Sequence, residues 1–385
     1  MTNDIIISDV LLEKTNLLVV VINQYGNVEY ISPAAERLIG YSASELYGDG
    51  WWRKTRSLEE AERVKRKLMQ LFSYNSDSVN VYEHELICKN GNKKWIRWEI
   101  NKISDDELIG IGQDITDRKQ FEASLKEQIL LLNDKNKNIT DSILYAKRLQ
   151  NFILKQAEKV TSFFTETFVL YLPKDIISGD YYSFYETKDN YVIVLADCTG
   201  HGVPGAMMSF LAHSIIREVI YSNHNTSPSD VLYKVDKGLQ DLLNNSTDEY
   251  ILDGMDLAVV FIDKNKSNLQ FSGAFRPLYI KTKGQFELLD FSKCSIGFSD
   301  FKKEFFTIER QIEKGDVFYL FTDGITDQFG GQRNKKLTKK AFLQILNDIQ
   351  DMPMEEQGAF LEYTLNNWKQ QNEQTDDITV IGIKI

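Results

Sequence analysis

The stretch that decides the fold is "YVIVLADCTGHGVPGAMMSFLAHSII", residues 191–216. Its apolar run, residues 191–196, is typical of a buried strand and ends on Asp197. A glycine-rich turn follows, and the pattern of residues 205–221 indicates a helix. The first question that the sequence raises is therefore what this strand-end aspartate does.

The glycine-rich turn permits two interpretations. Residues 200–205, "GHGVPG", match the G-x-G-x-x-G fingerprint of dinucleotide-binding sites. That fold requires a second parallel strand soon after the helix. Here a second helical pattern, residues 229–243, comes first, and no strand is indicated before residues 255–262. Because Asp197 would also oppose a pyrophosphate, we favour a metal site.

Other aspartates stand at the ends of predicted strands. Asp180 lies in "IISGDYYSFYE", Asp323 ends "VFYLFTDGITD", and Asp376 and Asp377 open "DDITVIGIKI". A single strand-end aspartate is commonly a turn residue. Several strands that share a sandwich would instead bring their carboxylates to one edge, where repulsion requires a cation. Oxygen ligands suit Mg²⁺ or Mn²⁺ rather than zinc.

Length and composition limit the class of protein. A chain of 385 residues is long enough for two or three domains, and its net charge of −11 disfavours nucleic acid or an anionic membrane as partner. Cys88, Cys198 and Cys294 are scattered, which indicates neither a disulfide framework nor a zinc knuckle. The N-terminus lacks a signal-peptide pattern, and no apolar run is long enough to span a membrane. We expect a soluble, cytoplasmic protein.

The first 115 residues or so alternate short strand patterns with turns. A hairpin turn, "QYGN", centres on Gly26. Strands are predicted at residues 17–22, 28–31, 79–88, 94–102 and 107–114, and helices at 34–39 and 57–72. This order and the closing "DITDRK" resemble a PAS sensor domain over residues 8–118. The resemblance does not specify a ligand, and the cysteine of flavin-binding photosensory members is missing.

Histidine and tryptophan in this region have structural and functional interpretations. His84 lies in a strand pattern, and a lone histidine there is expected to be a cross-strand surface residue rather than a haem ligand. We interpret four tryptophans as core and rim packing rather than as a cofactor site: Trp51, Trp52, Trp95 and Trp98.

A long helical pattern connects the two halves of the chain, from about residue 117 to residue 157. Its seam has the alternating four- and three-residue spacing of a coiled coil: Leu125, Ile129, Leu132, Asn136, Ile139, Ile143, Ala146, Gln150 and Ile153. Asn136 and Gln150 are polar seam positions, which fix register at a cost in stability. The helix is either a rigid spacer or a transmission element. Both interpretations predict a parallel homodimer.

Four ordered motifs in the last 220 residues or so carry a second resemblance. The motifs "ISGDYYSF", "VLADCTGHGVPGAMMS", "LFTDGITD" and "DDITVIGI" resemble those of the metal-dependent serine/threonine protein phosphatases, in the bacterial branch typified by the stage II sporulation protein E phosphatase. The resemblance spans about residues 140–385. It implies two packed antiparallel sheets flanked by helices, and a water held by two metal ions that attacks phosphorus without a covalent intermediate.

The resemblance also implies roles for individual residues. Asp197 would bridge the two ions, with the backbone carbonyl of Cys198 as a neighbouring ligand. Asp323 and Asp376 match positions that hold the second ion, and Asp180 matches the acidic residue on the first. Asp377 is the other half of the final acidic pair.

Two further residues are candidates for substrate binding. Arg276, in "SGAFRPLYI", departs from the pattern of this branch and would either grip the substrate phosphate or form a rim salt bridge. His201 would donate to a phosphate or leaving oxygen, or else remain in a supporting or solvent-exposed position. We interpret Asp253 and Asp256 as turn and strand-start residues rather than ligands. A basic segment, residues 329–342, is either a contact for an acidic partner or a solvated loop.

The sequence thus predicts an α+β chain with a PAS domain at residues 1–118, a coiled-coil helical linker at 119–160 and an α/β/β/α sandwich phosphatase domain at 161–385. The expected activity is hydrolysis of phosphoserine or phosphothreonine with two Mn²⁺ or Mg²⁺ ions, on a phosphorylated anti-sigma factor antagonist. One alternative is a non-catalytic scaffold with the same acidic edge. Another is a diguanylate cyclase, which "SGDYYSF" faintly resembles, although Tyr181 and Tyr182 stand where that family has an acidic residue.

Overall fold

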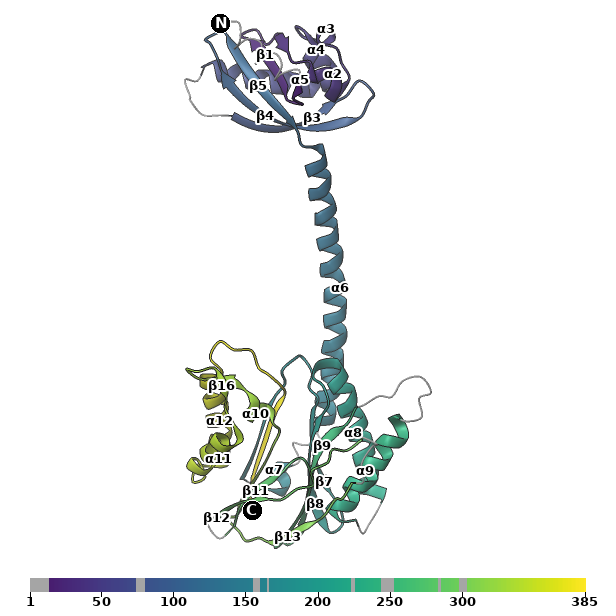
Figure 1. Cartoon of the computed structure of the whole chain (residues 1–385), viewed down its shortest axis with the longest axis vertical. Coiled ribbons are helices and arrows are strands. Elements are labelled where there is room, and N and C mark those ends of the chain that lie inside the picture. Colours follow the sequence, from purple (N-terminus) through teal and green to yellow (C-terminus); the bar gives the residue numbers. More distant parts are fainter. Residues whose placement is uncertain are drawn as a thin grey trace. The chain divides into compact units, whose positions relative to one another are not determined.

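The computed structural model describes residues 14–73, 80–154, 160–164, 166–222, 226–243, 253–282, 285–297 and 303–385. The chain divides into two compact units, residues 1–136 and 137–385 (Figure 1). The N-terminal segment without a signal-peptide pattern and residues 155–159 of the predicted linker lie outside the described residues. None of the helices in the described parts has the length and hydropathy needed to cross a membrane.

The N-terminal unit is built on a five-stranded antiparallel sheet. The strands are β1 (Leu18–Asn23), β2 (Val28–Ile31), β3 (Asn80–Ile87), β4 (Lys93–Lys102) and β5 (Glu107–Asp114), in the order β2-β1-β5-β4-β3. Every predicted strand of this half is confirmed, with ends shifted by no more than one residue. Gly26 has φ of 80° in the β1–β2 turn, a left-handed conformation that glycine adopts without strain.

Short helices cover this sheet. They are α2 (Ala34–Ile39), α3 (Ala43–Leu46), α4 (Gly50–Thr55) and α5 (Leu58–Met69), followed by the 3₁₀ turn η1 (Gln70–Ser73). Ser57 caps α5 by accepting a hydrogen bond from the Glu60 backbone N–H at 3.4 Å. The helix buries Ala61, Val64 and Leu68, which share one face at helical spacing.

The tryptophans of this unit pack as the sequence predicts. Trp51, Trp52 and Trp98 are buried in its core. Trp51 and Trp98 meet edge to face, with ring centroids 5.7 Å apart. Trp95 is partly buried, and its ring lies under the Lys119 ammonium group.

Helix α6 (Thr116–Leu154) is the predicted linker. Asp114 initiates it by accepting hydrogen bonds from the Thr116 backbone N–H and hydroxyl. Leu125, Ile129 and Leu132 of the predicted seam are exposed in the single chain. At Gln150 the seam prediction is wrong, because this side chain is buried against residues of the C-terminal unit itself.

The C-terminal unit contains two five-stranded antiparallel sheets. The first, in the order β13-β10-β9-β8-β7, comprises β7 (Asp180–Glu186), β8 (Asn190–Cys198), β9 (Met255–Asp263), β10 (Asn268–Ala274) and β13 (Ile308–Gln311). The second, in the order β12-β11-β14-β17-β6, comprises β6 (Glu166–Leu172), β11 (Leu278–Thr282), β12 (Gln285–Leu289), β14 (Val317–Phe321) and β17 (Ile378–Lys384).

Helices enclose the two sheets. The first sheet buries its outer face under α8 (Gly202–Ser222) and α9 (Pro228–Leu243), and the second packs against α11 (Lys339–Asp348) and α12 (Met354–Lys369). Inward-facing side chains such as Ile193, Val260 and Phe318 fill the space between the sheets. The shorter elements are α7 (Val160–Phe163), α10 (Gly324–Asp327), β15 (Phe329–Gly330) and β16 (Lys335–Lys336). The α/β/β/α sandwich is confirmed, and its antiparallel pairing excludes the dinucleotide-binding interpretation.

Candidate active site

Three aspartates lie side by side across neighbouring strands of the first sheet. Asp180 on β7 is paired with Asp197 on β8, and Asp197 is paired with Asp256 on β9. Directly paired residues point to the same face of a sheet. Leu195, two residues before Asp197 on β8, and Ala258, two residues after Asp256 on β9, belong to the core between the sheets. The aspartates therefore continue the inward-facing row at the point where the apolar core ends.

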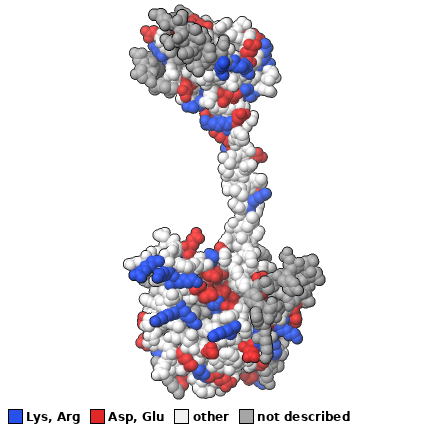
Figure 2. Space-filling view, in the orientation of Figure 1, with Lys and Arg blue, Asp and Glu red and all other residues white. Residues whose placement is uncertain are grey.

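The second sheet brings its own acidic residues to the same place. Asp323 follows β14, and Asp376 stands just before β17, the strand that pairs with β14. Asp197, Asp323 and Asp376 line one cavity of about 230 Å³. The other lining residues are Cys198, Thr199, Gly200, His201, Met255, Asp256, Arg276 and Ser295. The face of the C-terminal unit drawn in Figure 2 carries a cluster of acidic side chains with Lys and Arg side chains beside it.

Asp180 is buried and connects the two sheets. Its Oδ2 accepts hydrogen bonds from the hydroxyls of Thr322 (2.9 Å), which directly follows β14, and Thr379 (2.6 Å) of β17. Its Oδ1 is buried with no hydrogen-bond partner in the described structure. Burial raises the pKa of the Asp180 carboxyl, and the neighbouring Asp377 raises it further. This oxygen is therefore available to an additional ligand.

Two glycines allow the chain to fold tightly behind these carboxylates. A Cβ on Gly179 would lie 2.5 Å from the carbonyl oxygen of Gly200, and a Cβ on Gly205 would overlap the same oxygen. Only glycine leaves room for the three backbone segments to touch. The close approach fixes Asp180 next to the turn that follows β8.

Arg276 lies among the aspartates. Its Nη2 forms an ion pair with Asp197 Oδ2 and lies 3.3 Å from both Asp256 Oδ2 and Asp323 Oδ2. The preceding residue, Phe275, has φ of 53°, so the turn between β10 and β11 holds an unfavourable backbone conformation at this point. The guanidinium group supplies the positive charge that the aspartates require.

The ionisation of this cluster is strongly perturbed. Burial raises the pKa values of Asp197 and Asp256, whereas the Arg276 charge opposes that rise. Burial would lower the pKa of Arg276, but Asp197, Asp323 and Asp256 raise it above its usual range. The acidic groups outnumber the single cation, so the site would carry an excess of negative charge when all of them are ionised.

The comparisons with known proteins agree with this geometry. The family model described as stage II sporulation protein E (SpoIIE) matches residues 187–385, more than half of the chain. The chain belongs to the SpoIIE family. A second model, the PAS fold, matches residues 28–108. Both family resemblances found in the sequence are therefore confirmed.

Individual relatives support the same conclusion. The phosphoserine phosphatase RsbU of Bacillus subtilis (strain 168) is 30% identical over 162 residues, which cover 40% of this chain and 45% of RsbU. RsbP of the same organism, also named a phosphoserine phosphatase, is 25% identical over 214 residues, 54% of this chain and 49% of RsbP. The chain thus spans about half the length of these relatives. The solved PP2C domain of SiaA from Pseudomonas aeruginosa has a TM-score of 0.59 and 31% identity, covering 65% of this chain and 98% of that domain.

Phosphatases of this family use divalent metal ions, and the chemistry of the acidic residues here can be compared with what such ions require. The donors are carboxylate oxygens, which Mg²⁺ and Mn²⁺ prefer, and the unpartnered Asp180 Oδ1 fits a further ligand. As the side chains stand, the described residues contain no group of three acidic, histidine or cysteine side chains arranged around one point. Arg276 lies between the carboxylates instead. The carboxylate donors therefore fit divalent ions in their chemistry, but the Arg276 guanidinium group pairs with the same carboxylates.

The remaining predicted residues of the SpoIIE-family site differ in position. His201 lines the cavity, and its Nδ1 is 2.7 Å from Asp175 Oδ2. The Cys198 side chain is buried in the core under α8 and α9, where burial raises the pKa of its thiol, so only its backbone can serve the cavity. Asp377 does not line the cavity. Its carboxylate accepts hydrogen bonds from the backbone N–H groups of Lys174 and Gly179 and so holds the loop before Asp180.

Sequence reasoning missed one residue of the site. Asp256 was interpreted as a strand-start residue, but it lines the cavity and contacts Arg276. The signal was present in "MDLAVVFID", where Asp256, Ala258 and Val260 alternate along one face of β9. Only the pairing of β9 with β8 places that face beside Asp197. Asp253, by contrast, accepts a hydrogen bond from the Thr199 hydroxyl, as a turn residue can.

Proposed function

We propose that the chain is a metal-dependent phosphatase that hydrolyses phosphoserine or phosphothreonine in a partner protein. The observation that carries this proposal is the convergence of Asp197, Asp323 and Asp376 from two sheets on one cavity, beside a buried Asp180 with a free oxygen. Membership of the SpoIIE family and the similarity to two phosphoserine phosphatases support it.

In this proposal the carboxylates hold two divalent ions. Asp197, Asp180 through Oδ1 and the Cys198 carbonyl would bind one ion, and Asp197, Asp323 and Asp376 would bind the other. Such ions, when bound, activate water at neutral pH and stabilise the oxygens of the phosphoryl group. The buried Cys198 thiol, with its raised pKa, is unsuited to act as a nucleophile, which favours direct attack by water.

Two residues of the chain itself would act on the substrate. Asp175 orients the His201 ring by hydrogen bonding to Nδ1, which leaves Nε2 to donate a proton to the leaving oxygen when the ring is protonated. Arg276 would bind the phosphate once metal ions replace it as the partner of the aspartates, because a guanidinium group can donate two parallel hydrogen bonds to phosphate.

The linker supplies a route for regulation. The Gln150 side chain donates to the Ser178 carbonyl (2.7 Å) and the Ser209 hydroxyl (3.1 Å), and accepts from the Ser178 backbone N–H (3.2 Å). Ser178 is two residues before Asp180. We propose that a change in the register or order of α6 alters this loop and thereby the metal site. The exposed apolar seam of α6 supports a parallel homodimer as the state in which this happens.

The proposed substrate is a phosphorylated antagonist of an anti-sigma factor. It rests on the SpoIIE resemblance rather than on the cavity, which only requires a phosphorylated side chain that can enter. The alternative is a scaffold that binds the same partner without hydrolysis. The excess of negative charge at the site favours the enzyme, since a scaffold would have no need of a cation.

The test is phosphate release from a phosphoserine peptide by the full chain, with Mn²⁺, Mg²⁺ or a chelator. We expect release with either ion and none with the chelator. Binding of the peptide without release under any of these conditions would support the scaffold. Sedimentation equilibrium of the same sample measures the dimer separately, so a monomeric but active protein would remove only the proposed role of α6.

A further inference from the structure

The N-terminal unit contains a cavity that the phosphatase does not explain. Its volume is about 310 Å³, at the small end of the range for ligand sites, roughly 300–1,000 Å³. Val20 and Ile22 of β1, Trp98 and Ile100 of β4, and Leu108 of β5 form an apolar wall. The size and lining fit one small molecule with an apolar body.

Arg56 is the unusual residue of this cavity. It follows α4, lines the cavity and is only 6% exposed. Its Nη1 donates to the Thr55 hydroxyl at 2.9 Å, and its guanidinium carbon lies 5.3 Å from the Trp51 ring centroid and 5.4 Å from that of Trp52. Nε is buried without a hydrogen-bond partner. Among the described residues no carboxylate lies within ion-pair distance of this group.

The charge on Arg56 persists despite burial. Burial lowers the pKa of the guanidinium to about 10, which still leaves it protonated at neutral pH. A buried charge without a counter-ion is costly, whereas one that is paired and hydrogen-bonded is tolerated. The indole N–H of Trp98, another residue of the lining, is also buried without a partner. Two unsatisfied donors in one cavity indicate an acceptor that is absent from the chain itself.

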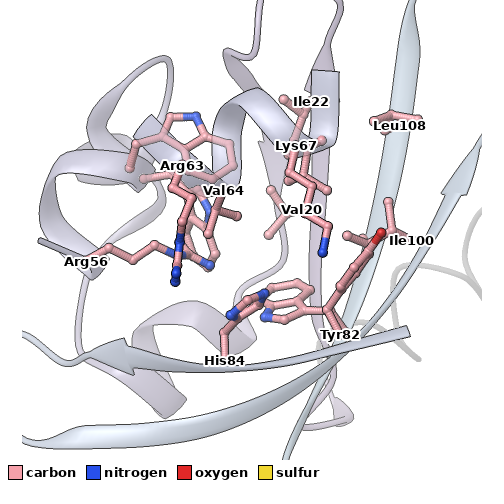
Figure 3. A pocket seen from close by; sticks show the side chains of 15 residues that line it. Val20, Ile22, Arg56, Arg63, Val64, Lys67, Tyr82, His84, Ile100 and Leu108 are labelled. Carbon is pink, nitrogen blue, oxygen red and sulfur yellow. The ribbon is translucent and has the colours of Figure 1, made fainter. Parts of the chain in front are cut away.

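The remaining charged residues of the lining have the same sign. Arg63 and Lys67, both exposed and both on α5, border the cavity, together with His84 of β3. Figure 3 shows the Arg56 and Arg63 side chains converging on the space above His84. No aspartate or glutamate is among the lining residues described. Glu60 lies 3.8 Å from Arg63 and pairs with that residue, while it acts on Arg56 only from beyond ion-pair distance.

His84 therefore differs from its expected position. It pairs across the strands with Ile96, as predicted, but it lines the cavity and stacks on Tyr82 instead of lying on open surface. Burial lowers its pKa, and the nearby Arg56 lowers it further. A neutral imidazole adds a hydrogen-bonding group to the cavity without adding charge.

We propose that this cavity binds a small organic carboxylate with a flat or chain-like apolar body. The carboxylate accepts hydrogen bonds from the Arg56 guanidinium, whose fork matches two carboxylate oxygens, and the body lies against Trp98 and the β1 side chains. Arg63 and Lys67 attract the anion to the cavity. The molecule is the chemical input of the sensor unit, independent of what the C-terminal unit hydrolyses.

The test is calorimetric titration of the full chain with three acids and their neutral amides: 4-phenylbutanoate, decanoate and 2-naphthylacetate. Each amide has the shape of its acid without the charge. A charged hydrogen-bond pair contributes about 1.5–3 kcal/mol, so we expect at least one acid to bind about tenfold or more tightly than its amide. Equal binding of acid and amide in all three pairs would overturn the proposal. Inorganic phosphate is titrated in parallel, and binding as tight as that of the best acid would overturn the requirement for an apolar body.

Two variants show whether Arg56 is responsible. Arg56→Met keeps the side-chain volume and should reduce the preference for acid over amide to less than about threefold. Arg53→Met is the matched control, because Arg53 is exposed on α4, three residues before Arg56, and pairs with Asp49, and it should keep the full preference. An Arg56→Met protein that still prefers the acid would contradict the assignment. Arg56→Gln provides the same test if Arg56→Met does not fold.

Discussion

Two buried arginines distinguish the two units of this chain. Arg56 and Arg276 are each 6% exposed. Arg276 contacts three carboxylates, whereas Arg56 has none within ion-pair distance among the described residues. At the first site three aspartates surround one guanidinium group, whereas at the second site the Arg56 guanidinium group has no directly paired carboxylate. This contrast underlies the two proposals, that the C-terminal unit binds cations and that the N-terminal unit binds an anion.

The surroundings act on the two side chains in opposite directions. Burial lowers the pKa of Arg56 to about 10, because the distant Glu60 offsets only part of the loss of solvent. Burial acts on Arg276 in the same sense, but the aspartates outweigh it and raise its pKa. Although the two arginines are equally buried, Arg56 destabilises its unit in the absence of a ligand, whereas Arg276 holds the aspartate cluster together.

The largest expected effect is the loss of activity when an aspartate of the C-terminal site, rather than Arg276, is replaced. Asp197→Asn should lower kcat for metal-dependent phosphate release by at least about 100-fold, because it removes the carboxylate shared by both proposed ions. Steady-state kinetics with Mn²⁺ measure this. Asp253→Asn, a nearby residue outside the cavity, is the control and should keep its activity. An active Asp197→Asn protein would show that the excess negative charge does not serve catalysis.

Arg276→Met tests whether the guanidinium group and a metal ion compete for the same carboxylates in the C-terminal unit. Without the guanidinium the carboxylates repel one another, so the metal-free C-terminal unit should lose about 3 kcal/mol of unfolding free energy. Mn²⁺ should restore most of it by taking over the positive charge. Scanning calorimetry with and without Mn²⁺ gives both values. Equal stabilisation of the variant and the natural chain by Mn²⁺ would mean that Arg276 and the ion do not compete.

Arg56→Met should change the unfolding free energy in the opposite direction to Arg276→Met. Replacing an unpaired buried charge by an apolar side chain of similar size should stabilise the ligand-free N-terminal unit by about 1 kcal/mol or more. The transition of this unit in the same calorimetric scans measures the change, and Arg53→Met should stay within about 0.5 kcal/mol of the natural chain. If Arg56→Met were as destabilising as Arg276→Met, the contrast between the two arginines would be wrong.

The smallest effect is expected at Asp256. Asp256→Asn leaves Arg276 two carboxylate partners and removes one charge from the cluster, so Mn²⁺ binding should weaken by a few-fold, about 1 kcal/mol or less. Calorimetric titration with Mn²⁺ measures this. Complete loss of Mn²⁺ binding would make Asp256 an essential ligand, equal in weight to Asp197.

Much of the fold could be predicted because the patterns are local. The strands of the N-terminal unit alternate and are bounded by turns, and residues 191–196 of β8 and the whole of β14 are continuous apolar runs that precede aspartates. The convergence of Asp197, Asp323 and Asp376 follows from those strand ends once a sandwich is assumed. The positions of these aspartates at strand ends in the sequence were sufficient to predict this part of the site.

What the sequence did not predict depends on pairing and on side-chain direction. Asp256 joins the site only through the register of β9 against β8. Arg276 reaches the aspartates because the turn at Phe275 adopts a left-handed conformation, which sequence patterns rarely reveal for a phenylalanine. Gln150 fitted the seam of a coiled coil by spacing, yet its hydrogen bonds are made inside the C-terminal unit. In each case a contact distant in sequence decides the role.

The contact of Gly179, Gly200 and Gly205 determines how this site tolerates mutation. At most buried positions the damage grows with the volume of the new side chain. At Gly205 the first added carbon already overlaps the Gly200 carbonyl oxygen, so alanine should be nearly as harmful as leucine. The loss of stability should therefore be nearly complete with the first added carbon and should increase little with larger side chains. Substitutions near Asp180 should therefore be tolerated only where the side chain points away from this junction. The position of the Asp180 carboxylate depends on the absence of a Cβ at Gly179 and Gly205.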